Sequence, residues 1–88
     1  MFTVYSKPAC RDCDSAKDLL KSRGLSFEVV NLDVGQTKLH GSKYIERAEL
    51  LKKFPFARTM PQITKNDSTA SLHIGGVSDL INYLKGSN

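Results

Sequence analysis

Hydrophobic positions along this chain change their spacing several times, and each change marks a predicted element. The apolar run 2–5 opens the chain and predicts a strand. From residue 11 to about residue 23 the apolar positions follow helical spacing, and Gly24 is a natural stop. The β-branched and aromatic stretch 27–32 predicts a second strand. A strand, a helix and a strand in about thirty residues form a βαβ unit, so these two strands are expected to pair in parallel.

A second helix is predicted in the middle of the chain. The segment from Asp33 to Gly41 is polar and rich in turn residues, which indicates a loop. Ser42 is a plausible N-cap for a helix that continues to Lys53, and Pro55 ends that helix. The inner face of the helix is expected to carry four side chains: Tyr44, Ile45, Ala48 and Leu51.

A hairpin and a third helix complete the predicted fold. Residues 62–65 and 70–74 predict short antiparallel strands, because the Asn-Asp-Ser sequence at 66–68 favours a turn. The last helix has apolar side chains at helical spacing: Val77, Leu80, Ile81 and Leu84. The element order is therefore β-α-β-α-β-β-α. We predict an α/β fold in which a four-stranded mixed sheet is flanked by three helices.

Length and composition indicate one globular domain over residues 1–88. The chain is 40% hydrophobic and 25% charged, and a chain of this size holds one core. It has no long apolar run and no signal-peptide pattern, so we expect a cytoplasmic protein without a membrane span. The net charge of +4 is spread along the chain, without a basic block interleaved with aromatics. This argues against a nucleic-acid partner and favours an anionic small ligand or an acidic protein.

The chain's only two cysteines lie at the first predicted strand-to-helix junction. Cys10 and Cys13 form a Cys-x-x-Cys motif, which at such a junction is typical of thiol–disulfide redox chemistry. N–H groups at the helix start would stabilise a thiolate on Cys10, which would attack, and Cys13 would resolve the mixed disulfide. Between them lie two candidate redox-tuning residues: Arg11 would stabilise the thiolate and Asp12 would destabilise it. The sequence alone therefore does not show whether the two together lower or raise the pKa of Cys10.

Simpler explanations exist for the cysteines and for several charged residues. The two cysteines could be half of a zinc site, or incidental core residues. A zinc site would need the distant His40 and His73, neither at finger spacing, and no metal is therefore expected. His73 would otherwise be a strand residue with an exposed ring. Lys7 and Arg58 would be solvated surface cations.

Two further segments carry candidate chemistry. Thr59-Met60-Pro61 leads into a predicted strand, where either a cis proline or an ordinary trans proline would fit. Gly75-Gly76 precedes the last helix, whose free N–H groups offer a place for a carboxylate. The simpler explanation for this second segment is that Ser78 and Asp79 cap the helix.

Taken together and in this order, these segments resemble the glutaredoxins, a family of the thioredoxin-like superfamily. Residues 7–13 (Lys-Pro-Ala-Cys-Arg-Asp-Cys) resemble the family's active-site segment. Residues 57–61 resemble its Thr-Val-Pro loop, and residues 74–80 resemble its Gly-Gly segment and closing helix. The resemblance covers nearly the whole chain. It implies a thioredoxin-like (glutaredoxin) fold, a cis Pro61 facing the cysteines and a glutathione groove between the three segments.

The resemblance also implies contacts to glutathione. By position, Lys7 would hold the glycyl carboxylate of the tripeptide. The backbone of Met60, next to Thr59, would pair with the cysteine portion like an added strand. The γ-glutamyl end would be received at the last helix by the backbone of Gly76 and by Ser78 and Asp79. Arg58 would assist as one more cation.

The function implied is that of a dithiol glutaredoxin, a monomeric glutathione-disulfide oxidoreductase that reduces protein disulfides and glutathione mixed disulfides. A ribonucleotide reductase is one expected client. Arg11-Asp12 stands where the family usually has Pro-Tyr, which leaves the redox potential open. Two alternatives remain. One is a thioredoxin-like carrier reduced by a flavoprotein reductase, and the other is an iron–sulfur carrier in which Cys10 and glutathione hold a cluster across a dimer.

Overall fold

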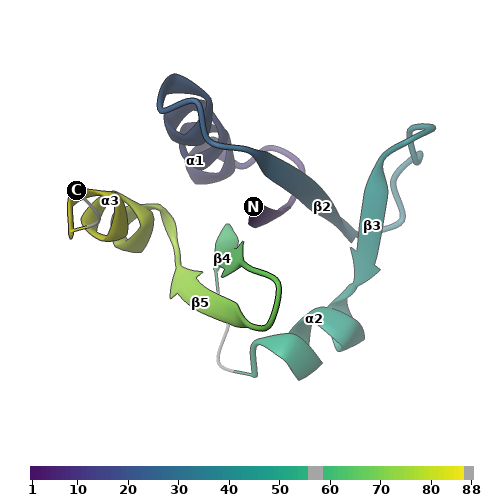
Figure 1. The fold of residues 1–88 in the computed structure, drawn as a ribbon. Coiled ribbons are helices and arrows are strands. Elements are labelled where there is room, and N and C mark those ends of the chain that lie inside the picture. The colour runs from purple at the N-terminus through teal and green to yellow at the C-terminus, as the bar shows by residue number, and fades with distance from the viewer. Residues whose placement is uncertain (56–58, 87–88) are drawn as a thin grey trace.

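The computed structural model describes residues 1–55 and 59–86. Within these residues the chain forms a mixed five-stranded sheet in the order β3-β2-β1-β4-β5. Helices α1 and α3 pack on one face of this sheet and α2 packs on the other (Figure 1). The elements are β1 (Phe2–Ser6), α1 (Arg11–Ser22), β2 (Phe27–Asp33), β3 (Lys43–Glu46), α2 (Arg47–Lys53), β4 (Gln62–Asn66), β5 (Ser71–Gly75) and α3 (Val77–Gly86).

The first half of the chain forms the predicted βαβ unit. β1 and β2 run parallel, with Phe2 opposite Phe27, and α1 connects them. α1 begins after Cys10, whose sulfur accepts the N–H of Cys13 at 3.2 Å. Shortly after the helix, Gly24 has a φ of +66°. Because glycine adopts a positive φ without a steric penalty, the chain can turn there toward β2.

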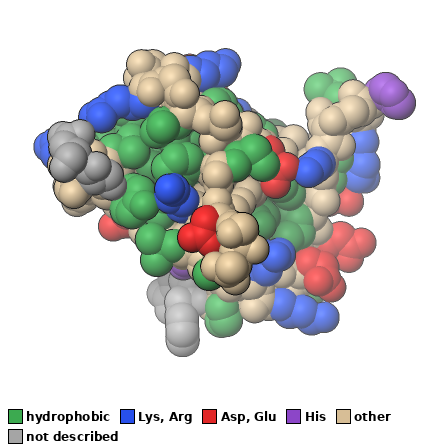
Figure 2. Space-filling view, viewed as in Figure 1, with side chains coloured by type: hydrophobic (Ala, Val, Ile, Leu, Met, Phe, Trp, Pro, Cys, Tyr) green, Lys and Arg blue, Asp and Glu red, His purple; other side chains and the backbone are tan. Residues whose placement is uncertain are grey.

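The face under α1 and α3, called here the helix-covered face, carries a continuous apolar core. The side chains that point to it from β1 and β4 interlock with those of the two helices. The buried members are Phe2, Val4, Ala16, Leu20, Ile63, Leu80 and Leu84. Half-buried hydrophobic side chains surround this core and appear at the surface between α1 and α3 (Figure 2).

The opposite face, called here the open face, carries a single helix among the residues described, the seven-residue α2. Beneath that helix lies a small apolar cluster of Tyr5, Leu32, Leu50 and Phe54. Farther along the strands the open face turns polar. Asn66 donates a hydrogen bond to Thr3 at 2.6 Å and accepts one from Thr64 at 3.1 Å.

The predicted helix over residues 42–53 is wrong in its first third, where the structure has β3, a strand additional to the four predicted. β3 pairs in parallel with β2, and Lys43 forms an ion pair with Glu28 at 2.6 Å. The edge of β2 is open to this pairing, and a β-branched or aromatic residue fits a pleated surface better than a helix start. α2 therefore begins only at Arg47, after the N-cap residue Glu46. The cap predicted at Ser42 does not form.

The predicted inner face of that helix also needs correction. Tyr44 and Ile45 are half-buried, but they belong to β3. In the shortened helix the buried residue is Leu50, whereas Ala48 and Leu51 are exposed.

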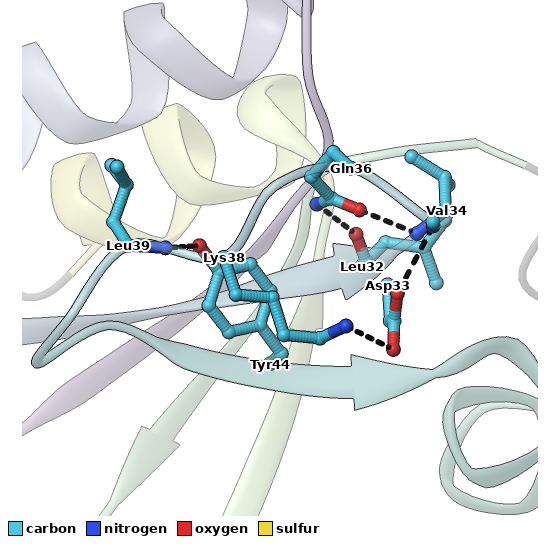
Figure 3. Close-up of polar contacts among 8 residues, drawn as sticks. Leu32, Asp33, Val34, Gln36, Lys38, Leu39 and Tyr44 are labelled. Carbon is cyan, nitrogen blue, oxygen red and sulfur yellow. Dashed lines mark hydrogen bonds and ion pairs between the residues drawn. The ribbon is translucent and has the colours of Figure 1, made fainter.

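The predicted loop between Asp33 and Gly41 is held by its own hydrogen bonds (Figure 3). Gln36 donates to the backbone oxygen of Leu32 at 2.9 Å and accepts the N–H of Val34 at 2.8 Å. At the far end of the loop, the Tyr44 hydroxyl accepts the N–H of Leu39 at 2.8 Å. Tyr44, which was expected on the inner face of a helix, instead belongs to β3 and ties this loop to that strand.

The C-terminal elements follow the prediction, except that Ile81, one of the predicted apolar-face residues of the last helix, is exposed. β4 and β5 form an antiparallel hairpin, and the turn between them is stabilised by the Asp67 carboxylate, which accepts the N–H groups of Thr69 and Ala70. Leu80 and Leu84 are the buried residues of α3. Among the residues described, no helix is long and apolar enough to cross a membrane.

Candidate functional site around Cys10 and Cys13

The two cysteines form a disulfide in the turn that leads from β1 into α1. Their Cα atoms are 5.2 Å apart. Cys13 is completely buried, whereas Cys10 keeps 9% of its surface exposed. Ala9, just before the motif, has a φ of +52°, a left-handed conformation that makes the turn tight. Because only Cys10 is accessible, an external thiol or disulfide would react there first.

The Thr59-Met60-Pro61 segment lies directly against this disulfide. The Met60–Pro61 peptide is cis, as the resemblance implies, and Pro61 is buried. The sulfur of Cys10 lies 3.8 Å from the backbone oxygen of Met60. A disulfide sulfur carries no proton, so in this oxidised form the contact is a packing contact rather than a hydrogen bond.

The start of α3 forms the third side of the site. The carboxylate of Asp79 accepts the N–H of Gly76 at 3.1 Å, which caps the helix. Gly75 has a φ of +119°, and a Cβ atom there would collide with this carboxylate. The capping explanation thus holds for Asp79. Ser78 is exposed at the same helix end.

These three segments enclose two adjoining hollows, which we call together the groove. One hollow has a volume of about 360 Å³ and runs from Pro61 to the start of α3. The other, of about 330 Å³, contains the exposed edge of Cys10. Asp12, Thr59 and Met60 line both hollows, so the two hollows adjoin at these residues.

The structure brings almost all of the predicted site residues into this groove. Lys7, Cys10 and Arg11 line the hollow at the disulfide. Gly76, Ser78 and Asp79 line the hollow at α3. Cys13 is linked to the groove through its disulfide, and Arg58 lies outside the described residues.

Arg47 is a candidate that the sequence prediction missed. It stands at the start of α2 and lines a small cavity of about 80 Å³ together with Lys7, Thr59 and Met60. A second cation is thereby placed next to Lys7 at the edge of the groove. The available signal was a basic residue at the start of a helix, but the predicted helix began four residues too early to reveal it.

The carboxyl groups with shifted pKa values lie away from the groove. The pKa of Glu28 is lowered mainly by its hydrogen bond from Lys43. The pKa values of Asp33 and Asp67 are lowered mainly by backbone N–H groups in their own turns, from Gly35 and from Thr69 respectively. These shifts therefore concern stability rather than the chemistry of the cysteines. In the described part of the chain, no three His, Cys, Asp or Glu side chains come together as metal ligands.

The fold and the disulfide define a class of protein, the thiol–disulfide oxidoreductases of the thioredoxin-like superfamily. The sequence profile of the glutaredoxins matches residues 2–69. Glutaredoxin 3 of Escherichia coli (strain K12) is 35% identical over 77 residues, which cover 88% of this chain and 77% of that protein. The chain belongs to the glutaredoxin family.

A further relative and two solved structures agree with this assignment. The mitochondrial glutaredoxin-2 of Rattus norvegicus is 32% identical over 76 residues, 86% of this chain and 42% of that protein. The solution structure of glutaredoxin from Brucella melitensis has a TM-score of 0.60 at 25% identity, covering 98% of this chain and 79% of that one. A crystal structure of a buckwheat glutaredoxin–glutathione complex has a TM-score of 0.60 at 21% identity, covering 97% and 68% respectively. The predicted thioredoxin-like glutaredoxin fold is confirmed, with five strands instead of four.

Proposed function

We propose that this protein catalyses the glutathione-dependent reduction of protein disulfides and glutathione mixed disulfides. The observation that carries the proposal is the position of Cys10. Its sulfur, the accessible one of the pair, lies 3.8 Å from the backbone oxygen of Met60, a residue that lines both hollows of the groove. The cysteine of a bound glutathione would there lie beside Cys10, and the two ends of the tripeptide would reach into the two hollows.

The charges along the groove are suited to both ends of glutathione. Lys7 and Arg47 would receive the glycyl carboxylate at one end. At the other end, backbone N–H groups of the first turn of α3 would receive the γ-glutamyl carboxylate, and Asp79 would attract the ammonium group. The backbone of Met60, a half-buried residue that lines both hollows, would pair with the middle of the tripeptide. Thr59 and Pro61 line the hollow at α3. Arg58 is proposed to assist in binding glutathione.

The reaction with a glutathione mixed disulfide takes two exchange steps. The Cys10 thiolate attacks the glutathione sulfur, and the client sulfur leaves as a thiolate that takes up a proton. A second glutathione thiolate then attacks the sulfur bound to Cys10, which releases oxidised glutathione and the Cys10 thiolate. One disulfide is reduced for each oxidised glutathione formed.

A protein disulfide needs the second cysteine. Cys10 attacks one client sulfur, and Cys13 then attacks Cys10, which releases the reduced client and leaves the Cys10–Cys13 disulfide. That disulfide is the form present in the structure. Two glutathione molecules would reduce it again. We propose that the protein acts as a monomeric electron donor in the cytoplasm, with a ribonucleotide reductase as one client.

Replacing each cysteine separately tests the mechanism. Cys10→Ser should abolish turnover of a small glutathione mixed disulfide in an assay coupled to glutathione reductase. Cys13→Ser should keep that activity but lose the reduction of a protein disulfide such as that of insulin. A Cys10→Ser variant with wild-type turnover would contradict the mechanism, because no other thiol remains at the groove surface.

A flavoprotein reductase is the competing source of electrons. Asp12 favours it, because this residue adds a carboxylate to a groove that is proposed to hold an anionic tripeptide. Reduction of the Cys10–Cys13 disulfide should be measured with glutathione and, separately, with thioredoxin reductase and NADPH. Faster reduction by the reductase at physiological concentrations would reverse the proposal, and Asp12→Asn should move the ratio back toward glutathione.

A further inference from the structure

His73 contacts both ends of the segment that carries the Thr59–Pro61 loop. Its ring packs against the ring of Phe54, with centroids 4.5 Å apart, at the point where α2 ends. Its Nε2 atom lies 2.7 Å from the side-chain oxygen of Gln62. The amide nitrogen of Gln62 in turn donates to the backbone oxygen of Thr59 at 2.8 Å. One residue of β5 is thus linked to the chain before and after the loop.

The direction of these hydrogen bonds is determined by the amide of Gln62. Since its nitrogen donates to Thr59, its oxygen must accept, and the Nε2 atom of His73 must carry the proton. Gln62 is only 7% exposed, so an unsatisfied amide there would be unfavourable. The three groups therefore form a directed chain from His73 through Gln62 to Thr59.

We infer that His73 and Gln62 are positioning residues that hold the Thr59–Met60–Pro61 loop at the distance from Cys10 that glutathione requires. The inference rests on the proposed function. Met60 provides the backbone oxygen next to Cys10, and its side chain packs against the same apolar cluster that contains Phe54. A displacement of this loop would move the surface against which the tripeptide pairs, while Cys10 keeps its place as the N-cap residue of α1.

The surroundings of His73 make a clean test feasible. The ring borders a cavity of about 240 Å³ on the open face, so a changed side chain there has room to adjust. The helix-covered core contains none of the three residues in the chain of hydrogen bonds. A substitution at His73 should therefore change the loop without unfolding the protein.

The kinetic test compares two variants with the wild type. His73→Phe keeps a ring against Phe54 but removes the donor, and His73→Gln offers a donor at a similar position. For a glutathione mixed disulfide, the His73→Phe variant should raise KM about fivefold, the effect of one neutral hydrogen bond, with little change in kcat. His73→Gln should recover most of this loss. Leu72→Ala, an exposed neighbour in β5, is the matched control and should leave KM unchanged.

Two measurements separate positioning from a general loss of structure. The far-UV circular-dichroism spectrum should be the same in all variants, because the helix-covered core is not disturbed. The chain has two methionines, so methyl-labelled methionine gives two NMR signals. The signal of Met60, which packs against the apolar cluster that contains Tyr5 and Phe54, should shift or broaden in His73→Phe. The signal of Met1 should not change.

The outcomes distinguish this inference from the proposed function. An unchanged KM together with an unchanged Met60 signal in His73→Phe would overturn the positioning role and leave glutathione dependence intact. A wild-type protein that does not turn over the mixed disulfide would overturn the proposed function. In that case the Met60 signal decides alone whether His73 holds the loop, and an unchanged signal would reject it.

Discussion

The helix-covered face and the open face of the sheet share the same strands but are built on different principles. On the helix-covered face, two helices of 12 and 10 residues bury a continuous apolar core. On the open face, a helix of seven residues and the strands under it bury four side chains, and several other strand positions carry hydroxyl, amide, imidazole or charged groups. Alternation along β1 and β4 sends every second residue to each face, so one pair of strands serves both.

The two faces differ in what they contribute: the helix-covered face mainly stabilises the fold, and the open face mainly positions the loop of the proposed glutathione groove. The helix-covered face holds α1, and with it Cys10 and Cys13, by apolar burial that needs no particular polar geometry. The open face instead holds the Thr59–Pro61 loop through directional contacts, from Gln62 and His73. A domain of 88 residues has few side chains to spare for a core. Thorough coverage of one face allows the other to remain partly open around the groove.

The largest expected effect is on the free energy of unfolding, when one buried leucine on each face is replaced by alanine. Leu20, on the helix-covered face, is 0% exposed, and Leu50, on the open face, is 4% exposed. Leu20→Ala should lower the free energy of unfolding by about 4 kcal/mol, near the upper end of such changes. Leu50→Ala should cost about 2 kcal/mol, because a cavity already borders Leu50 and the site can relax. Urea denaturation of both variants measures the difference, and equal losses would contradict the contrast between the faces.

The helix-covered face was also the more predictable one. Its residues come from long elements with clear periods: positions 13, 16 and 20 in the first helix and positions 80 and 84 in the last. The motif residues of the groove were predicted as well, since each occurs beside a turn or helix start with a recognisable sequence. Local patterns are sufficient for both.

The open face depends on contacts between distant residues, which a local pattern does not contain. Tyr44 and Ile45 are compatible with either a helix or a four-residue strand, and only the open edge of β2 decides between them. His73 was predicted to be an exposed strand residue. It is exposed, yet its ring packs on Phe54 and its nitrogen reaches Gln62, 11 residues earlier. Arg47 was missed for the same reason, because its role depends on where α2 begins.

A second prediction concerns Phe54, which joins the apolar part of the open face to the loop. Phe54→Leu removes the edge-to-face contact with Tyr5 and the packing against His73. The free energy of unfolding should fall by only about 1 to 1.5 kcal/mol, since a large apolar side chain remains. The KM for a glutathione mixed disulfide should nevertheless rise more than in Leu20→Ala at a temperature where both are folded. If the two variants rank the other way in KM, recognition is not concentrated on the open face.

A third prediction tests whether the polar network of the open face contributes to stability. Thr64 is 7% exposed and donates to Asn66 at 3.1 Å. Thr64→Val keeps the shape of the side chain and removes the hydroxyl, which should cost about 0.5 to 1 kcal/mol. The matched variant Thr69→Val, in the exposed hairpin turn, should cost less despite the contact of its hydroxyl with Asp67. Thermal denaturation of both variants is the measurement, and a stabilised Thr64→Val protein would show that this network carries no stabilising role.

The smallest expected effect is electrostatic and depends on pH. Glu28 lies on the open face, and its pKa is lowered from an ordinary value of 4.5, mainly by the hydrogen bond from Lys43. A carboxyl whose pKa is lower in the folded than in the unfolded protein adds stability above its ordinary pKa. This stability is lost as the pH falls through the lowered folded value. Glu28→Gln should therefore have a lower Tm than the wild type at pH 7, and the two should converge as the pH falls through the lowered pKa of Glu28.

The control for Glu28 is Glu49, which forms an exposed pair with Lys52 at 3.4 Å within α2. Glu49→Gln should change the Tm less than Glu28→Gln at pH 7, because pairs at this spacing on a solvated helix contribute little. Asp33 and Asp67 also have lowered pKa values, but they titrate equally in all three proteins and cancel from the comparison. A difference in Tm between wild type and Glu28→Gln that does not shrink at all as the pH falls below the ordinary pKa of Glu28 would assign the effect to packing rather than to charge. The open face would then resemble the helix-covered face more closely than its polar composition indicates.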